Sequence, residues 1–284
     1  MTDGRIQLAD GRDVGFADQG GDGTAVLWCH GGPGSRLEPA AMAGAVSDAG
    51  LRVIGIDRPG YGLSTPRPGR TIADWVPDGL AVADHLGVER FIAVGVSTGG
   101  AYALALAASV PERVIGTVAC CALSDMRWSE GRALMTGSGT LDIWDAPDRD
   151  AAMAIAAELF GADGSNMATM VGEAGLAPAD AALLTDEAFV GAWMAGLSEM
   201  FAHGVAGYVD DRRADGPGWG SFDVAKVSCP VIVVHGEADT IVPVVNARHT
   251  AGLVHQAELR IFPDHGHLSV VAEVIPAVLA LAAG

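Results

Sequence analysis

Ser97 stands at the centre of Gly95-Val96-Ser97-Thr98-Gly99, a G-x-S-x-G pattern. The apolar run 91–96 before it is typical of a buried strand, and the Ala-rich run 99–109 after it is typical of a helix. A serine on such a tight strand-to-helix turn adopts a strained backbone, and the neighbouring glycines remove side chains that would clash. The pattern therefore predicts a nucleophilic hydroxyl at the positive end of a helix.

Two other glycine-rich motifs fit this turn poorly. A dinucleotide fingerprint has glycine where this chain has Ser97, and a phosphate-binding P-loop requires a lysine. The only lysine in the sequence is Lys226, far from this turn. We therefore favour the nucleophile interpretation over a nucleotide-binding loop.

An acid and a histidine follow two later apolar runs. Asp239 comes shortly after the run 231–234, and His267 comes shortly after the run 258–262. The chain order Ser97, Asp239, His267 is that of a catalytic triad at the carboxyl edge of a parallel sheet. We prefer His267 to His265 as the base, since His267 lies at the turn into the last predicted helix. A metal site made of His265, His267 and Asp239 is disfavoured, because the sequence lacks a pair of histidines at helical spacing.

Asp125 is the second candidate for the acid, because it also follows an apolar run. We prefer Asp239, since the following Thr-Ile-Val-Pro sequence predicts a loop-to-helix entry that fixes its position.

The loop His30-Gly31-Gly32-Pro33-Gly34-Ser35 follows the apolar run 25–29. We expect its Gly-Gly turn to bring a backbone N–H towards Ser97, beside the N–H of Thr98. Two such donors would stabilise the oxyanion of a tetrahedral intermediate. We interpret His30 as a brace for this loop rather than as a catalyst.

The elements that must position these residues alternate between strand and helix. Runs 25–29, 51–56, 91–96, 114–120, 231–234 and 258–262 are apolar on both faces, as in a parallel sheet covered by helices. Helices are predicted over 71–86, 99–109, 242–253 and 268–283. Two short runs separated by Asp10-Gly11 predict an antiparallel hairpin at the sheet edge. The fold class is therefore α/β.

The alternation is interrupted between about residues 127 and 211, where the sequence predicts helices and no strand. We predict a core domain of residues 1–126 and 212–284, with a helical cap of residues 127–211. The stretch 210–220 is rich in charge, glycine and proline, which predicts a hinge or linker.

The composition excludes several classes of protein. The formal charge is −18, from 35 acidic and 17 basic residues, which disfavours nucleic-acid partners. With a single lysine, a polybasic membrane anchor is implausible, and no apolar run is long enough to span a bilayer. The N-terminus has no signal-peptide pattern, so we expect a cytoplasmic protein with a small-molecule substrate. A homodimer is left open.

Five stretches together resemble the α/β-hydrolase superfamily: HGGPGS (30–35), DRPGYGLS (57–64), GVSTGG (95–100), GEADTIVP (236–243) and DHGHLS (264–269). The resemblance implies a mostly parallel eight-stranded sheet flanked by helices, with the helical cap inserted after the sixth strand. It also implies the triad Ser97, Asp239 and His267, with oxyanion amides at Gly32 and Thr98. Members with epoxide hydrolase or dehalogenase activity carry aspartate at the nucleophile position, so Ser97 argues against both activities.

These residues predict a serine hydrolase that cleaves carboxylic esters through an acyl-enzyme, without cofactor or metal. Aromatic and methionine side chains of the cap are expected to form an apolar acyl pocket for small to medium substrates. The residues predicted to bind substrate are Gly31, Trp144, Trp193 and Met200.

Three alternatives remain open. The HGGPG loop also resembles prolyl aminopeptidases, in which cap carboxylates would hold a substrate ammonium; Thr98 departs from the tryptophan usual in that family. The candidate carboxylates are Glu158, Glu173, Glu187 and Glu199. Carbon–carbon bond hydrolases and lyases use the same triad. A non-catalytic receptor is disfavoured, since the triad is complete.

Overall fold

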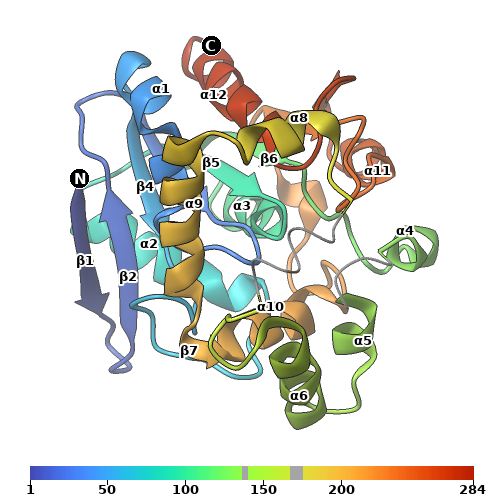
Figure 1. The fold of residues 1–284 in the computed structure, drawn as a ribbon. Helices are drawn as coiled ribbons and strands as arrows, with labels where there is room; N and C mark the ends of the chain where they lie inside the picture. The colour runs from blue at the N-terminus through green and yellow to red at the C-terminus, as the bar shows by residue number, and fades with distance from the viewer. Residues whose placement is uncertain (136–139, 167–174) are drawn as a thin grey trace.

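The protein is built on one eight-stranded sheet. In Figure 1 its strands β1, β2 and β4 lie on the left, and β5 and β6 lie near the centre. The computed structural model describes residues 1–135, 140–166 and 175–284. The strand order is β1-β2-β4-β3-β5-β6-β8-β9, and all strands from β4 onward in this order run parallel. β1 and β2 form the predicted antiparallel hairpin, and β2 also runs antiparallel to β4. The strands are β1 (Thr2–Gln7), β2 (Asp13–Asp18), β3 (Ala25–Cys29), β4 (Arg52–Ile56), β5 (Phe91–Val96), β6 (Val114–Cys120), β8 (Val231–Gly236) and β9 (Glu258–Phe262).

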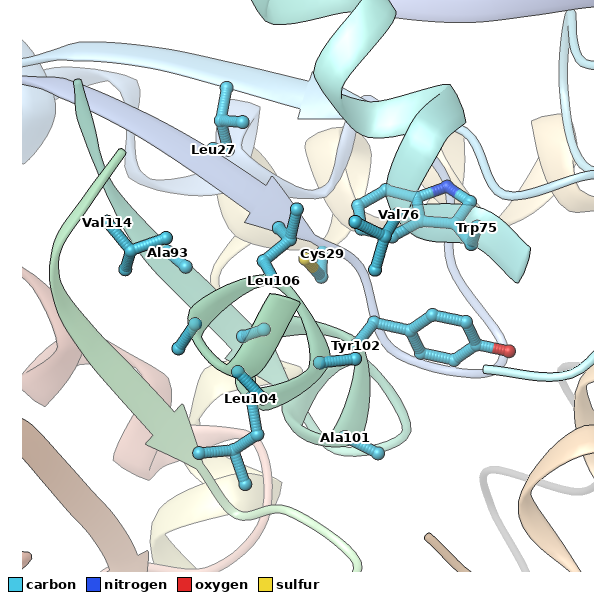
Figure 2. Close-up of a cluster of buried hydrophobic side chains, with 14 of the residues drawn as sticks. Leu27, Cys29, Trp75, Val76, Ala93, Ala101, Tyr102, Leu104, Leu106 and Val114 are labelled. Atoms are coloured by element: carbon cyan, nitrogen blue, oxygen red, sulfur yellow. The ribbon is translucent and has the colours of Figure 1, made fainter. Parts of the chain in front are cut away.

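Helices cover both faces of this sheet and bury its apolar side chains. Figure 2 shows the cluster around α3, in which Leu106 of that helix lies near Cys29 of β3. α3 is buried along nearly its whole length, as its mainly small and apolar side chains require. The opposite face packs on α1 and α12. The helices of the core are α1 (Ala43–Asp48), α2 (Val76–His85), α3 (Gly99–Ser109), α11 (Val245–Leu253) and α12 (Val274–Ala282), with short 3-10 turns η1 (Glu38–Met42), η2 (Ala73–Trp75), η3 (Val224–Lys226) and η4 (Ser269–Glu273).

A mainly helical segment joins β6 to β8, and we call residues 127–215 the insertion. Its helix α9 crosses the front of the molecule in Figure 1 and packs against η1, while α8 packs against η4. The described elements are α4 (Ser129–Ala133), α5 (Thr140–Asp145), α6 (Arg149–Phe160), α8 (Pro178–Leu183), α9 (Glu187–Met200), β7 (Ala202–Val205) and α10 (Ala206–Asp215).

Two predictions for this segment are wrong. The short strand β7 interrupts a region that was expected to have no strand. The stretch predicted as a linker begins inside helix α10, which runs across the predicted domain boundary between residues 211 and 212. The charged residues that suggested a solvated linker are buried: Asp211, Arg212 and Asp215 pair with one another or with core arginines.

Candidate active site

Ser97 lies in the sharp turn between β5 and α3, as its motif predicts. Its φ is 53°, a left-handed conformation that is strained for a residue with a side chain. Its N–H donates to the carbonyl of Cys120 at 2.9 Å, which ties the turn to β6. A Cβ atom added to Gly95 would lie 2.2 Å from the carbonyl oxygen of Gly99, so the turn cannot accept a larger residue there. The neighbouring backbone thus holds Ser97 at the carboxyl end of the sheet.

Asp239 and His267 meet at the same edge of the sheet. The Nδ1 atom of His267 lies 2.8 Å from Oδ2 of Asp239, and both side chains are buried. The other carboxylate oxygen accepts the N–H groups of Ile241 at 2.9 Å and Val242 at 2.8 Å. Because the Nδ1 atom faces a carboxylate, it carries the proton, which leaves Nε2 as the basic nitrogen.

The Asp239–His267 pair shifts the pKa of each partner. Burial alone would raise the pKa of Asp239, but the charge of His267 and the hydrogen bonds from both His235 and His267 lower it. Burial would lower the pKa of His267, but the neighbouring Asp239 carboxylate raises it well above 6.5. The carboxylate therefore stays ionised and stabilises a positive imidazolium.

The alternative residues lie elsewhere. His265 is half-exposed and its Nε2 lies 3.8 Å from a carboxylate oxygen of Glu273. Asp125 accepts a hydrogen bond from the Nε of Arg127 at 2.9 Å and from the N–H of Trp219 at 3.0 Å, so it organises its own loop. Neither contact involves Ser97 or His267.

Two neighbours of the Asp–His pair were not predicted from the sequence. The Nε2 of His235 lies 2.8 Å from the carbonyl of Val242 and 3.2 Å from Oδ2 of Asp239. Cys121 has a φ of 41° and its thiol is within hydrogen-bonding reach of His267; burial raises the pKa of this thiol. The only sequence signal was indirect: each residue lies at the carboxyl end of a strand that ends at the site.

Buried polar groups hold the 30–35 loop through hydrogen bonds to its backbone and to His30. Arg58 donates to the carbonyl of Gly31 at 2.8 Å and also to the carbonyl of His30. The N–H of Arg58 lies 3.2 Å from Nε2 of His30, whose Nδ1 is 2.6 Å from the carbonyl of Gly31. Nε2 is thus an acceptor and Nδ1 a donor, and burial, the largest cause, lowers the pKa of His30 well below its ordinary value. His30 has the contacts of a neutral brace.

Glu38 and Thr98 complete the surroundings of this loop. The carboxylate of Glu38 accepts the N–H of Gly31 at 2.7 Å and the indole N–H of Trp28 at 2.8 Å. A Cβ on Gly32 would lie 2.9 Å from Oγ1 of Thr98, so the backbone of Gly32 lies directly against Thr98. This contact involves the side chain of Thr98, so the oxyanion site at the N–H groups of Gly32 and Thr98 stays a prediction.

Arg212 brings an unpredicted buried charge to the turn after Ser97. Its Nη2 donates to Oγ1 of Thr98, and its guanidinium pairs with Asp215 at 2.5 Å. Its Nε has no hydrogen-bond partner among the described residues. In the same buried cluster Asp211 pairs with both Arg58 and Arg70. The guanidinium groups of Arg58, Arg70 and Arg212 thus lie against the carboxylates of Asp211 and Asp215, and Arg58 also interacts electrostatically with the buried carboxyl of Glu38.

A cavity of about 640 Å³ opens between these loops and the insertion. Ser97 and His267 both line it, together with Gly31, Gly32 and Arg212. The rest of its wall is mainly apolar and includes Phe160, Leu183, Phe189, Trp193 and Leu197 of the insertion. The cavity is large enough for a small organic substrate beside the serine.

Two predicted substrate contacts require correction. Trp144 lines a separate cavity of about 400 Å³ and donates its indole N–H to Asp215 at 2.7 Å. Met200 is fully buried in the insertion's own core with Phe160 and Leu197. Both side chains face other parts of the insertion because helical periodicity shows which residues are apolar but not which neighbour they contact. Gly31 and Trp193 do line the cavity beside Ser97.

Of the four glutamates considered as ammonium ligands, the three within the described residues do not line this cavity. Glu199 pairs with Arg36 at 2.7 Å, whereas Glu158 and Glu187 are exposed on their helices. Glu173 lies outside the described residues. The carboxylates that do line the cavity are Glu38 and Asp186.

The described residues contain neither a metal-site cluster nor a membrane-spanning helix. No group of three histidine, cysteine or acidic side chains there has the arrangement of a metal site. Within the same ranges, none of the helices is both long and apolar enough to cross a membrane.

Comparison with known proteins agrees with this architecture. A family model described as alpha/beta hydrolase fold matches residues 24–150. A 2-hydroxymuconate semialdehyde hydrolase of Pseudomonas putida is 29% identical over 271 residues, which cover 93% of this chain and 87% of that protein. A proline iminopeptidase of Neisseria gonorrhoeae is 32% identical over 133 residues, or 44% of this chain and 43% of that protein. The enol-lactonase from Burkholderia xenovorans LB400 superposes with a TM-score of 0.74 over 99% of this chain and all 100% of its own, at 19% identity.

Proposed function

We propose that this chain, which has the α/β-hydrolase fold, is a serine hydrolase that cleaves carboxylic esters of small to medium, mainly apolar substrates. The observation that carries this proposal is the 2.8 Å hydrogen bond between Asp239 and His267, at the cavity that Ser97 also lines. An activated hydroxyl, an oriented base and an apolar chamber are what acyl transfer to a serine needs.

The proposed reaction has two halves. The Oγ of Ser97 attacks the ester carbonyl while Nε2 of His267 takes its proton, and Asp239 stabilises the resulting imidazolium. The N–H groups of Gly32 and Thr98 would receive the developing oxyanion; removal of one such donor typically costs about 3–4 kcal/mol. The imidazolium then protonates the departing alcohol. Water repeats the cycle and releases the acid from Ser97.

The wall of the cavity supports an apolar acyl or alcohol group. Phe189 and Trp193 of α9 lie with ring centroids 6.2 Å apart on one side of the cavity. Ile241 and Leu268 line it from the loops that carry Asp239 and His267. We propose that the insertion acts as the cap of this chamber, with its boundaries near residues 127 and 215.

A carbon–carbon bond hydrolase is the second candidate, and Arg212 is the observation that favours it. This buried guanidinium lines the cavity, and its Nε has no hydrogen-bond partner among the described residues. It could receive a carboxylate of the substrate. The relative from Pseudomonas putida is named for a muconate semialdehyde, a substrate class that bears a carboxylate.

A labelling experiment and a substrate panel test these proposals. A fluorophosphonate probe should label the wild-type protein at Ser97, as located by peptide mapping, and Ser97→Ala should remove both the label and the turnover of p-nitrophenyl butyrate. Full residual turnover in folded Ser97→Ala would reject the serine mechanism.

The panel compares three bonds under one set of conditions: p-nitrophenyl butyrate, proline p-nitroanilide, and a carboxylated vinylogous diketone. The ester proposal predicts the highest kcat/KM for the butyrate. A higher kcat/KM for the diketone, lost in Arg212→Met, would instead support carbon–carbon cleavage.

A further inference from the structure

Asp180, in helix α8 of the insertion, places a buried carboxylate against the loop that carries His267. Oδ2 of Asp180 accepts the N–H of His267 at 2.8 Å. Oδ1 accepts the N–H of Ser269 at 2.8 Å and its hydroxyl at 2.7 Å. The side chain is fully buried, and α8 packs directly on η4, which begins at Ser269. One insertion residue thus contacts the loop on both sides of Leu268.

The loop is shaped to receive this carboxylate. The N–H of Gly266 donates to Oγ of Ser269 at 2.9 Å, so the hydroxyl links the start of the loop to Asp180. A Cβ on Gly266 would lie 2.3 Å from Oδ2 of Asp180. The glycine before the histidine therefore leaves the space that the carboxylate occupies.

The chemistry of this contact favours positioning over stabilisation. The donors to Asp180 are two backbone N–H groups and one hydroxyl, and no arginine or lysine of the described ranges pairs with it. Hydrogen bonds from N–H groups to an ionised carboxylate are strong and directional. A buried carboxylate without a cation is costly, however, and an apolar side chain would seal the same helix contact at less cost. What the carboxylate adds is a fixed backbone at His267.

We propose that Asp180 is a positioning residue for His267 and that it makes the alignment of the base depend on a seated insertion. This inference rests on the proposed role of His267 as the general base. The hydrogen bonds to the main chain at 267 and 269 hold the imidazole where Nδ1 reaches Asp239. Displacement of α8 would release them together and leave the base free to turn away from Ser97.

The insertion also contacts the other two loops of the site. The hydroxyl of Ser35 donates to the carbonyl of Gly196 in α9 at 2.7 Å, and Arg212 of α10 donates to Thr98. Asp180 differs from these contacts because its carboxyl group accepts a hydrogen bond from the backbone of the proposed base, His267, directly. The insertion thus contacts the 30–35 loop, the turn after Ser97 and the loop that carries His267. Asp180 makes the contact with the loop of the proposed base.

The test compares Asp180→Asn with Asp150→Asn in the full chain. Both aspartates lie in the first turn of an insertion helix, but Asp150 is exposed. In Asp180→Asn an amide NH₂ replaces one acceptor and faces an N–H donor. A misplacement of about 1 Å can reduce a rate about 100-fold, so we expect kcat for p-nitrophenyl butyrate to fall about 10- to 100-fold with little change in KM. Asp150→Asn should keep the wild-type kcat.

Two readouts separate positioning from a merely structural role. The inflection of the acid limb of kcat/KM should fall in Asp180→Asn, since a displaced imidazole loses contact with Asp239. The other charged or titratable groups that face His267, Cys121 and Glu38, are unchanged in this variant. Amide hydrogen exchange at His267 and Ser269 should accelerate in Asp180→Asn but not in Asp150→Asn. Ser269→Ala, which removes only one donor, should shift both readouts less and serves if Asp180→Asn does not fold.

The outcomes are distinct from those that test the proposed function. A lower melting temperature with wild-type kcat, inflection and exchange would show that Asp180 only stabilises the fold, and would overturn the inference. If wild-type Ser97 takes no fluorophosphonate label, the hydrolase proposal fails, while the exchange rates at His267 and Ser269 still decide whether Asp180 fixes this loop.

Discussion

The turn region of residues 91–109 and the anchor region of residues 202–220 both lie beneath the cavity, but they are buried by opposite means. The first consists of β5, the Ser97 turn and α3, whose side chains are almost all apolar or small. The second contains α10, in which Asp210, Asp211, Arg212 and Asp215 are buried. Burial by apolar side chains leaves a pattern in the sequence, whereas burial by paired charges resembles a solvated loop.

The largest effect that we predict is the loss of kcat when Asp239, the partner of the proposed base, is replaced. Asp239→Asn presents an amide to Nδ1 of His267 and favours the tautomer with the proton on Nε2, which cannot act as a base. A loss of kcat of about 10⁴-fold is expected for an acid-to-amide change at this position. The variant should stay folded, as judged by circular dichroism and its melting temperature.

The same variant gives a pH prediction. The neutral imidazole is the active form, so kcat/KM rises with pH through the pKa of His267, which Asp239 raises well above 6.5. Without the carboxylate charge the inflection should move to lower pH. Initial rates measured between about pH 5 and pH 9 would show this shift; an unchanged inflection would mean that Asp239 is not the partner of the base.

A single substitution in the anchor region should lower the free energy of unfolding at least as much as one in the turn region. Asp211→Asn leaves the guanidinium groups of Arg58 and Arg70 without their shared carboxylate, and breaking such a buried pair typically costs about 3–5 kcal/mol of unfolding free energy. Leu104→Ala, a cavity in α3, should cost about 2–5 kcal/mol. Urea denaturation of both variants measures these free energies.

Activity distinguishes these two variants more sharply than stability. Arg58 also holds the carbonyl groups of His30 and Gly31, so Asp211→Asn should lower kcat even where the protein is folded. Leu104→Ala should keep kcat near the wild-type value. If Asp211→Asn and Leu104→Ala lowered kcat equally, the anchor region would not support the catalytic loops more than the turn region does. Asp48→Asn, at an exposed position, is the control for an acid-to-amide change.

The difference between the regions explains how far sequence reasoning succeeded. The strands over 91–96 and 114–120, and the helix over 99–109, were predicted at their observed bounds, because each is mainly apolar and Pro111 follows the helix. The G-x-S-x-G motif placed Ser97 in its turn for the same local reason. Helix α10 was missed because its charges pair with Arg58 and Arg70, more than 140 residues away along the chain.

The site shows the same limit. The Asp239–His267 contact was predicted from residue type and chain order, which fix the edge of the sheet. Asp180, Arg212 and Glu38 gave no local signal, because a carboxylate or guanidinium group is normally solvated and only the tertiary contacts show otherwise. The choice of Trp144 and Met200 as pocket residues was wrong for a related reason: composition identifies apolar residues but not the direction in which an insertion helix faces.

The pH dependence of the unfolding free energy tests the role of Glu38, a buried carboxyl of the core domain. Burial, the largest cause, raises its pKa from 4.5 to about 7. A carboxyl whose native pKa is raised stabilises the fold fully below pH 4.5 and loses that contribution as pH rises through about 7. Glu38→Gln should remove this pH-dependent loss of unfolding free energy, which a pKa rise from 4.5 to about 7 makes about 3 kcal/mol in total. Urea denaturation at several pH values measures it, and an identical slope in both proteins would assign it to other groups, such as Asp215.

The smallest predicted effect concerns the two tryptophans of the insertion. Trp193 lines the cavity beside Ser97, whereas Trp144 lines the separate cavity and donates to Asp215. Trp193→Ala should lower kcat/KM for short acyl esters about tenfold, because one lost apolar contact in a pocket is worth about 1–3 kcal/mol. Longer acyl chains should lose less, since they fill the space left by the indole.

Trp144→Phe should leave this chain-length profile unchanged and cost only about 1 kcal/mol of stability, from the lost hydrogen bond to Asp215. A series of p-nitrophenyl esters from acetate to octanoate, measured on both variants, separates the two residues. If Trp144→Phe altered the profile and Trp193→Ala did not, the acyl group would occupy the cavity beside α10 rather than the one under α9. The anchor region would then belong to substrate recognition as well as to the support of the catalytic loops.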